Sequence, residues 1–125
     1  MLNRVVVRGV SYHPEATLLV NFYINEERKA VPVRLIPVDD NPYDHNAVMI
    51  EAQLGKLWGH IGFLASELCQ QFREMTDSRA VTGDVIEADV AENGKYAGIV
   101  VACDLPRLLN RQCAVGNQPK PVDIL

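Results

Sequence analysis

Short runs of apolar and β-branched residues recur along this chain, and turn-forming residues separate them. Runs of this kind, whose side chains alternate between two faces, are typical of β-strands. The stretch 92–95 reads Glu-Asn-Gly-Lys, and Asn-Gly between two such runs indicates a tight hairpin because both residues tolerate positive φ. The pattern predicts strands over the following ranges: 4–10, 17–24, 30–38, 47–51, 57–61, 81–91 and 96–103.

A helical period interrupts this pattern in the middle of the chain. Leu64, Leu68, Phe72 and Met75 recur at steps of four, four and three residues. Such steps place the apolar side chains in one stripe along a helix. We therefore expect a helix over roughly 65–75.

Six or seven short strands with one internal α-helix favour a mainly β fold, a small antiparallel partial barrel of the OB or SH3 type. Closing such a sheet removes its edges and buries one face of each strand. Pro32 and Pro37 indicate an edge strand or strand ends, because proline cannot donate to the ladder. We expect a single domain over 1–110, with a short helix over 104–109, and a C-terminal tail over 111–125.

Composition restricts the class of protein further. The chain is 48% hydrophobic and 22% charged, which is ordinary for a globular protein and too apolar for disorder. No apolar run approaches the roughly 20 residues of a membrane span, and the first residues lack the pattern of a signal peptide. Cys69, Cys103 and Cys113 form no CxxC or CxxH pair, which argues against a zinc site or a disulfide framework. We expect a soluble, cytoplasmic protein with no membrane association.

The net charge of −4 argues against non-specific coating of a polyanion, which needs clustered Lys and Arg. The charge is unevenly distributed, however. Residues 1–36 carry five basic and three acidic side chains, whereas residues 37–54 carry four acidic side chains and neither Lys nor Arg. A compact phosphate-binding spot fits this distribution, and a broad basic face does not.

The most informative stretch is 41–48, which reads NPYDHNAV. Proline fixes its own φ and pushes Asn41 towards an extended conformation. Asn41, Asp44 and Asn46 can each bond to nearby backbone, as in Asx turns. Two interpretations follow: a rigid loop that presents Tyr43 and Asp44 to a ligand, or a tied crossover with Tyr43 at the edge of the core.

Together with IGFLASELC at 61–69, this loop resembles the HIRAN family of nucleic-acid-binding modules. In that family a strand is followed by NPYDxNAV, a glycine turn, and a hydrophobic-Gly-aromatic segment that leads into a helix. Gly9-Val10 in the first predicted strand and Arg34 shortly before the loop also fit. The resemblance covers roughly residues 4–103.

The resemblance implies that the protein binds the 3′ end of single-stranded DNA. Tyr43 would hold the terminal base, since any base offers a face for stacking. Asp44 would accept a hydrogen bond from the free 3′ hydroxyl and repel a phosphate in its place. Tyr96 lies roughly where the family supplies another stacking aromatic. The predicted nucleic-acid-binding residues are Tyr43, Asp44, Asn41, Phe63, Tyr96, Arg4 and Arg8.

The chain also departs from the family at positions that contact DNA. The first strand reads Val-Val-Val at 5–7 where the family has a basic and aromatic pair. Phe63 replaces a histidine and either stacks on a base or belongs to the core, and Ser66 replaces a lysine. Each lost charge-assisted contact typically costs about 1.5–3 kcal/mol. Arg4 and Arg8, with Lys56 and His60, are the candidates to compensate.

No enzyme motif is present: the chain lacks a P-loop, a GxSxG elbow, an HExxH zinc motif and a dinucleotide fingerprint. We therefore expect no catalysis, no metal and no small-molecule cofactor. The main hypothesis is a nucleic-acid-binding module for single-stranded DNA ends in DNA repair or replication, working with a separate helicase or nuclease chain. The alternative is a protein-interaction or structural module that has kept a HIRAN-like fold and lost DNA binding.

Overall fold

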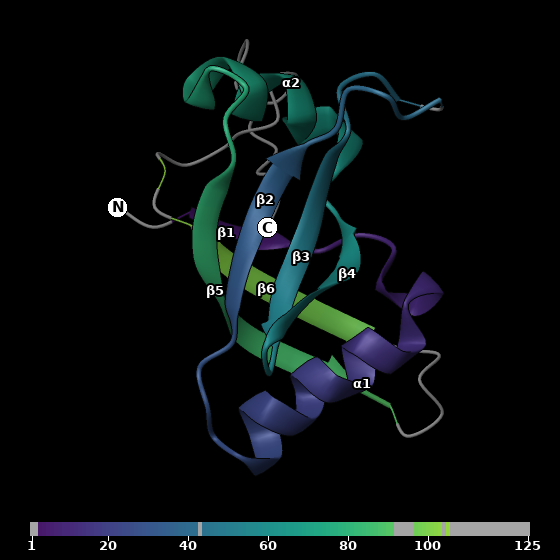
Figure 1. The fold of residues 1–125 in the computed structure, drawn as a ribbon, viewed down its shortest axis with the longest axis vertical. Coiled ribbons are helices and arrows are strands. Elements are labelled where there is room, and N and C mark those ends of the chain that lie inside the picture. The colour runs from purple at the N-terminus through teal and green to yellow at the C-terminus, as the bar shows by residue number, and fades with distance from the viewer. Residues whose placement is uncertain (1–2, 43, 92–96, 104, 106–125) are drawn as a thin grey trace, which may run out of the picture.

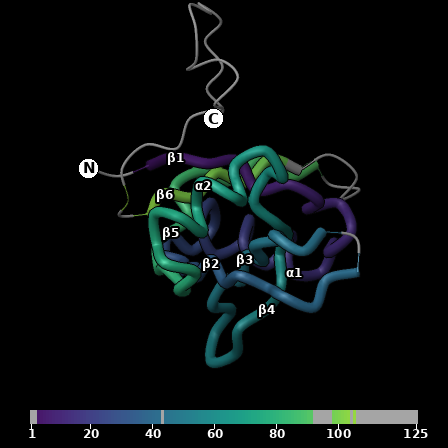
Figure 2. Tube along the Cα trace, turned by 90° about the horizontal axis from the view of Figure 1, so that it is seen from above, coloured from purple at the N-terminus to yellow at the C-terminus, as the bar shows by residue number. Residues whose placement is uncertain are grey.

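Six strands form one antiparallel sheet in the computed structural model, which describes residues 3–42, 44–91, 97–103 and 105. Their order is β1-β6-β5-β2-β3-β4, and Figure 2 shows them following one another around a curve in this order. Their bounds are β1 Asn3–Val6, β2 Pro32–Pro37, β3 Val48–Leu54, β4 Leu57–Phe63, β5 Val81–Val90 and β6 Ala97–Cys103. The expected mainly β fold class is confirmed, and the prolines of β2 stand at its two ends.

The two outer strands of the sheet meet just beyond β1. The Arg8 N–H donates to the carbonyl of Phe63 over 2.8 Å, and the Phe63 N–H donates to the carbonyl of Arg8 over 2.8 Å. This pair of bonds joins the chain after β1 to the end of β4, so the sheet closes into a small barrel. A Cβ atom at Gly62 would collide with the Arg8 carbonyl and the Val7 side chain, so glycine permits this close approach.

The interior of the barrel is filled by apolar side chains from alternate positions of the strands. In β2 and β3, Val33, Leu35, Ile50 and Ala52 are fully buried, whereas the residues between them are half-buried on the outer face. This period of two is the pattern that a sheet with one covered face requires.

Helix α2, Ser66–Thr76, lies above one end of the barrel and is the helix that the periodicity predicts (Figure 1). It turns Leu68, Cys69 and Phe72 into the core. None of the helices in the described parts of the chain is long and apolar enough to cross a membrane.

A helix covers the opposite end of the barrel, where the sequence pattern predicts a strand over 17–24 (Figure 1). This helical segment consists of three consecutive elements: the 3₁₀ turn η1 at Val10–Tyr12, the helix α1 at Pro14–Asn21 and the π-helical turn η2 at Phe22–Glu26. The predicted strand is therefore wrong. Pro14 stands at the first helical position, where its fixed φ favours a helix.

Short apolar runs are ambiguous between helix and strand, and this one illustrates why. Thr17 and Val20 are buried and Ile24 packs against the core, which is the i, i+3, i+7 spacing of a helix. The exposed Leu18 and Leu19 hide that period because they are apolar too.

Strands β5 and β6 pair antiparallel up to Val90 and Ala97, as the predicted hairpin requires. The Asn-Gly turn itself, the expected helix over 104–109 and the tail over 111–125 lie outside the described residues.

Candidate functional site

The loop between β2 and β3 is tied by its own side chains. The Asn41 Oδ1 accepts from the backbone N–H of Asp44 over 3.1 Å, and the Asp44 Oδ1 accepts from the N–H of Asn46 over 2.9 Å. At the base of the loop the Val38 N–H donates to the carbonyl of Ala47 over 2.8 Å. The Asx turns predicted at Asn41 and Asp44 are confirmed, and Asn46 takes part through its backbone.

Arg73 of α2 anchors this loop from the side of the helix. Its guanidinium donates to the carbonyls of Asn46, Val38 and Ala47 over 3.0–3.1 Å and to the Asp39 carboxylate over 2.9 Å. The Arg73 side chain is only 13% exposed. The sequence pattern alone did not point to Arg73 as a loop anchor. The one feature of the sequence that bears on Arg73 is its position four residues after Cys69, which places it on the side of the predicted helix that is buried.

The Cys69 thiol lies under the same loop. It is 1% exposed and donates to the carbonyls of Ala65 and Leu64 over 3.4 and 3.6 Å. Burial, with a smaller contribution from the negative charge of Asp44, raises the pKa of Cys69 to about 11. The thiol is therefore neutral at physiological pH.

The raised pKa of Cys69 predicts a pH dependence of stability. Since the folded-state pKa lies above the ordinary value of 9.0, its contribution to the free energy of unfolding is complete below pH 9 and is lost as the pH rises towards 11. Urea denaturation at several pH values should show the free energy of unfolding falling between pH 9 and 11. In Cys69→Ala this fall with pH should be smaller. Equal slopes for the two proteins would contradict the assignment.

Of the other predicted binding residues, Phe63 and Arg8 lie next to each other, whereas Arg4 lies apart from them. Phe63 ends β4 half-buried, and the exposed Arg8 is joined to it through the two backbone bonds that close the barrel. Arg4 extends the other way: its guanidinium lies 3.8 Å from the Glu87 carboxylate of β5, and both side chains are exposed. Arg8 therefore adjoins the end of β4, whereas Arg4 does not.

A chain of ring contacts begins at Phe63. The His60 ring meets it edge-on with 4.8 Å between centroids, and the His13 ring lies 4.2 Å from His60. The His60 Nε2 lies 2.9 Å from the carbonyl of Gly62, which can only accept, so Nε2 carries the hydrogen. Burial and the neighbouring His60 lower the pKa of His13, which favours a neutral ring.

An open, shallow pocket of about 420 Å³ lies beside these rings. The ring of Tyr12, 84% exposed, stands at the pocket. Its lining residues come from η1, the start of α1 and β4: Tyr12, His13, Pro14, Glu15, Ala16 and His60.

Further along β4 an arginine stacks on the single tryptophan of the chain. The Arg34 guanidinium carbon lies 4.2 Å from the centroid of the Trp58 ring, and its Nε donates to the Glu51 carboxylate over 2.6 Å. Arg34 and Glu51 are direct cross-strand partners on β2 and β3. The ion pair holds the guanidinium over the indole, which is a favourable cation–π arrangement.

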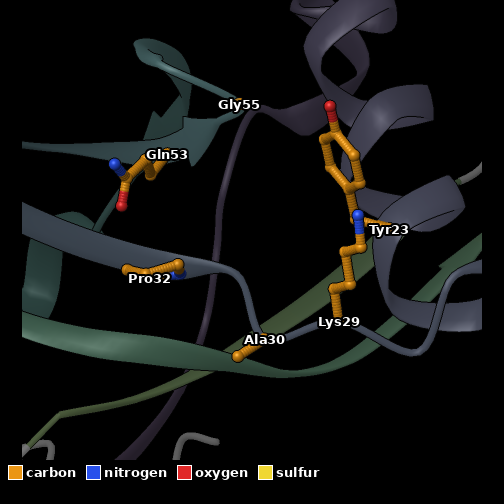
Figure 3. Close-up of a pocket in the computed structure, with 6 residues that line it drawn as sticks. All are labelled: Tyr23, Lys29, Ala30, Pro32, Gln53 and Gly55. Atoms are coloured by element: carbon orange, nitrogen blue, oxygen red, sulfur yellow. The ribbon is translucent and has the colours of Figure 1, made fainter.

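A second pocket, of about 390 Å³, opens between the end of η2 and the β3–β4 turn (Figure 3). In Figure 3 the side chains of Tyr23 and Lys29 stand on one side and those of Gln53 and Pro32 on the other. Lys29 is 66% exposed, and its Nζ lies 3.2 Å from the Glu27 carboxylate. Ala30 and Gly55 complete the lining.

Two of the predicted binding residues, Tyr43 and Tyr96, lie outside the described residues. Within the described parts of the chain, no group of three or more His, Cys, Asp or Glu side chains could hold a metal ion. Trp58 and His13 were not among the residues predicted for the site. For Trp58 the signal was the alternation Trp58-Gly59-His60, which places the rings of Trp58 and His60 on one face of a strand. His13 meets the ring of His60 only through the fold.

Comparisons of the chain with protein-family models, with curated proteins and with solved structures found no match. The resemblance to the HIRAN family therefore stays a prediction from the two motifs.

Proposed function

We propose that this protein is a nucleic-acid-binding module that holds the end of a single DNA strand between the Asp44 loop and the rings of β4. The observation that carries the proposal is the continuous set of ring contacts from Phe63 through His60 to His13. Base stacking on such rings contributes about 1–3 kcal/mol per base and tolerates any sequence.

The loop and the rings are neighbours in the barrel. The chain leaves the loop through Ala47 and enters β3, where Met49 pairs directly with Phe63. The Leu64 N–H donates to the carbonyl of Val48 over 2.9 Å, which fixes the end of β4 against the loop. A strand whose terminal nucleotide meets Asp44 would therefore have its bases within reach of these rings.

Asp44 supplies the recognition of a free 3′ hydroxyl in this proposal. Its half-buried carboxylate uses Oδ1 to accept from the Asn46 N–H, and an ionised carboxylate has further lone pairs to accept from a hydroxyl. A phosphate at the same position would meet its negative charge. A terminal hydroxyl would be preferred for this reason.

The distribution of charge supports a compact site rather than a long one. Exposed Arg8 stands next to Phe63, whereas Arg73 is already bonded to the loop and Asp39. With a net charge of −4, the protein would depend on stacking and end recognition more than on release of counterions. A DNA repair or replication context, with a separate helicase or nuclease chain, fits a module that marks strand ends.

Fluorescence anisotropy at low salt tests the proposal with short single-stranded DNA that ends in a 3′ hydroxyl or a 3′ phosphate. We expect the hydroxyl form to bind at least about tenfold more tightly, which corresponds to one hydrogen bond to a charged group. Asp44→Ala should remove the preference for the 3′ hydroxyl, and it also removes the Asx turn that Asp44 makes with Asn46. Equally weak binding of both ends would overturn the proposal.

Asp44→Asn is the matched variant, because the amide keeps an oxygen that accepts from the Asn46 N–H but lacks the charge. It should bind the two ends with similar affinity while its thermal midpoint stays close to that of the wild type. Retained discrimination in Asp44→Asn would show that the carboxylate charge does not select the end.

One observation favours the alternative, a protein-interaction module. Leu18, Leu19 and Phe22 on α1 and η2 are 42–45% exposed, and their spacing of three and four residues makes Phe22 a neighbour of both leucines on the helix surface. Patches of this kind often mark contacts with another protein. Absence of DNA binding with an intact fold would favour this second function.

A further inference from the structure

The outer face of β3 and β4 carries its ring side chains in a column that runs away from the Asp44 loop. The register pairs Met49 with Phe63, Glu51 with His60 and Gln53 with Trp58. All of these side chains are half-buried on the outer face of the barrel, whereas Ile50, Ala52 and Ile61 between them are buried inside. Phe63, His60 and Trp58 therefore succeed one another along a single edge of the molecule.

The spacing between Trp58 and His60 leaves room for a base. Trp58 and His60 are two residues apart on a strand, which places their Cα atoms about 6.6 Å apart. That distance is roughly twice the ~3.4 Å rise between stacked bases. Two stacking distances leave room for one base between the side chains of Trp58 and His60, whereas the rings of His60 and Phe63 already touch edge-on.

The Arg34–Trp58 pair offers two stacked planar groups at the end of the column. Bases stack both on indole rings and on arginine guanidinium planes. Glu51 fixes Arg34 by the 2.6 Å bond and offsets most of its charge. The pair is thus a stacking surface, with little capacity to attract a phosphate by itself.

A cation for the adjoining phosphate stands at the far end of the same face. Gln53, the cross-strand partner of Trp58, lines the pocket of Figure 3 together with Lys29. The Lys29 side chain is 66% exposed, and its Nζ lies 3.2 Å from the Glu27 carboxylate. Because an exposed ion pair of this kind is weak, the ammonium can turn to a phosphate more readily than the less exposed Arg34 can. A strand that passes Trp58 enters this pocket and meets the ammonium there.

We propose that Arg34 and Trp58 form a second nucleobase-binding subsite, and that single-stranded DNA runs from the Asp44 loop along β4 to the Lys29 pocket. This inference rests on the proposed function and deepens it, because it assigns a path and a length to the bound strand. The bound segment spans several nucleotides, in the range of the ~4–16 nucleotides that small barrel domains cover.

Trp58 provides the test directly, because it is the only tryptophan in the chain and its emission reports contact with a base. The full chain is titrated with oligothymidylates of about three and about nine nucleotides, both with a free 3′ hydroxyl, a choice that brackets the expected site size. The longer strand should quench Trp58 and the shorter one should bind without quenching. Anisotropy of the same labelled strands measures binding independently.

Arg34→Lys keeps the charge and removes the planar group, so it should weaken binding of the longer strand about tenfold and leave the shorter strand unaffected. Arg79→Lys, the same substitution at an exposed position paired with Asp77 at 3.8 Å, is the control and should bind like the wild type. Thermal midpoints of both variants verify folding.

The outcomes separate the two proposals. Binding of the longer strand without quenching, or equal affinities of Arg34→Lys and the wild type, would overturn the subsite and leave end recognition standing. Quenching without any preference for a 3′ hydroxyl would support the subsite and overturn end recognition. No binding of either strand would overturn both.

Discussion

Replacing Arg73 with alanine is expected to lower the free energy of unfolding by about 3 kcal/mol and to abolish recognition of DNA ends. The guanidinium is nearly buried and bonds to three backbone carbonyls and one carboxylate of the loop. Alanine would leave the carbonyls of Val38 and Ala47 without this donor at the base of the loop. Each hydrogen bond to a charged group contributes about 1.5–3 kcal/mol, and the bonds of one side chain are not additive.

Urea denaturation measures the stability change, and hydrogen exchange of the Asn46 amide measures the order of the loop. Faster exchange at Asn46 would show that the Asx turn depends on Arg73. Arg79→Ala is the control. The guanidinium of Arg79 lies 3.8 Å from the Asp77 carboxylate, and an exposed ion pair of this kind contributes about 0–1 kcal/mol. Ordinary surface substitutions change the free energy of unfolding by up to about 0.5 kcal/mol. A decrease of less than about 1 kcal/mol in Arg73→Ala would therefore contradict the anchoring role.

Gly62→Ala is expected to have an effect of similar size, also about 3 kcal/mol, by opening the barrel. A Cβ atom there would overlap the Arg8 carbonyl and the Val7 side chain, and the carbonyl cannot move away without disturbing its bond from the Phe63 N–H. Because the same bonds position Phe63, binding of single-stranded DNA should weaken together with stability.

Gly98→Ala is the matched control for this substitution. A Cβ atom at Gly98 of β6 would meet nothing within 4 Å. Alanine there should be neutral or stabilise by about 0.5–1 kcal/mol, because glycine loses more backbone entropy on folding. Thermal denaturation of the two variants side by side checks the prediction. A Gly62→Ala protein as stable as Gly98→Ala would show that the barrel closure does not need a glycine.

The Asp44 loop was predictable because its geometry is local. Asn41 bonds to the backbone three residues ahead and Asp44 two residues ahead, so the sequence contains both partners of each bond within one turn. The same holds for α2, whose buried Leu68 and Phe72 repeat at the helical period. In the strand predicted over 30–38, the alternation of the sequence also places Val33 and Leu35 on one face, and both are buried.

The wrong assignment of residues 17–24 has the opposite cause. Leu18, Leu19 and Val20 are equally apolar, and only the barrel decides that Val20 is buried while both leucines stay exposed. The open end of the barrel needs a cover, and α1 supplies it with Thr17 and Val20. A short run of apolar residues does not by itself indicate which of them will be buried against the rest of the protein.

The sequence by itself determined the mainly β class, the helix α2 and the rigid Asx loop, because each depends on residues that are close along the chain. Only the tertiary structure decided how Arg73 reaches the loop, since its partners lie 26 to 35 residues away. It also paired Arg8 with Phe63, placed Arg4 near Glu87, and brought Arg34 over the Trp58 ring. These contacts depend on strand order and register, which are set when all the strands bury their inner faces together.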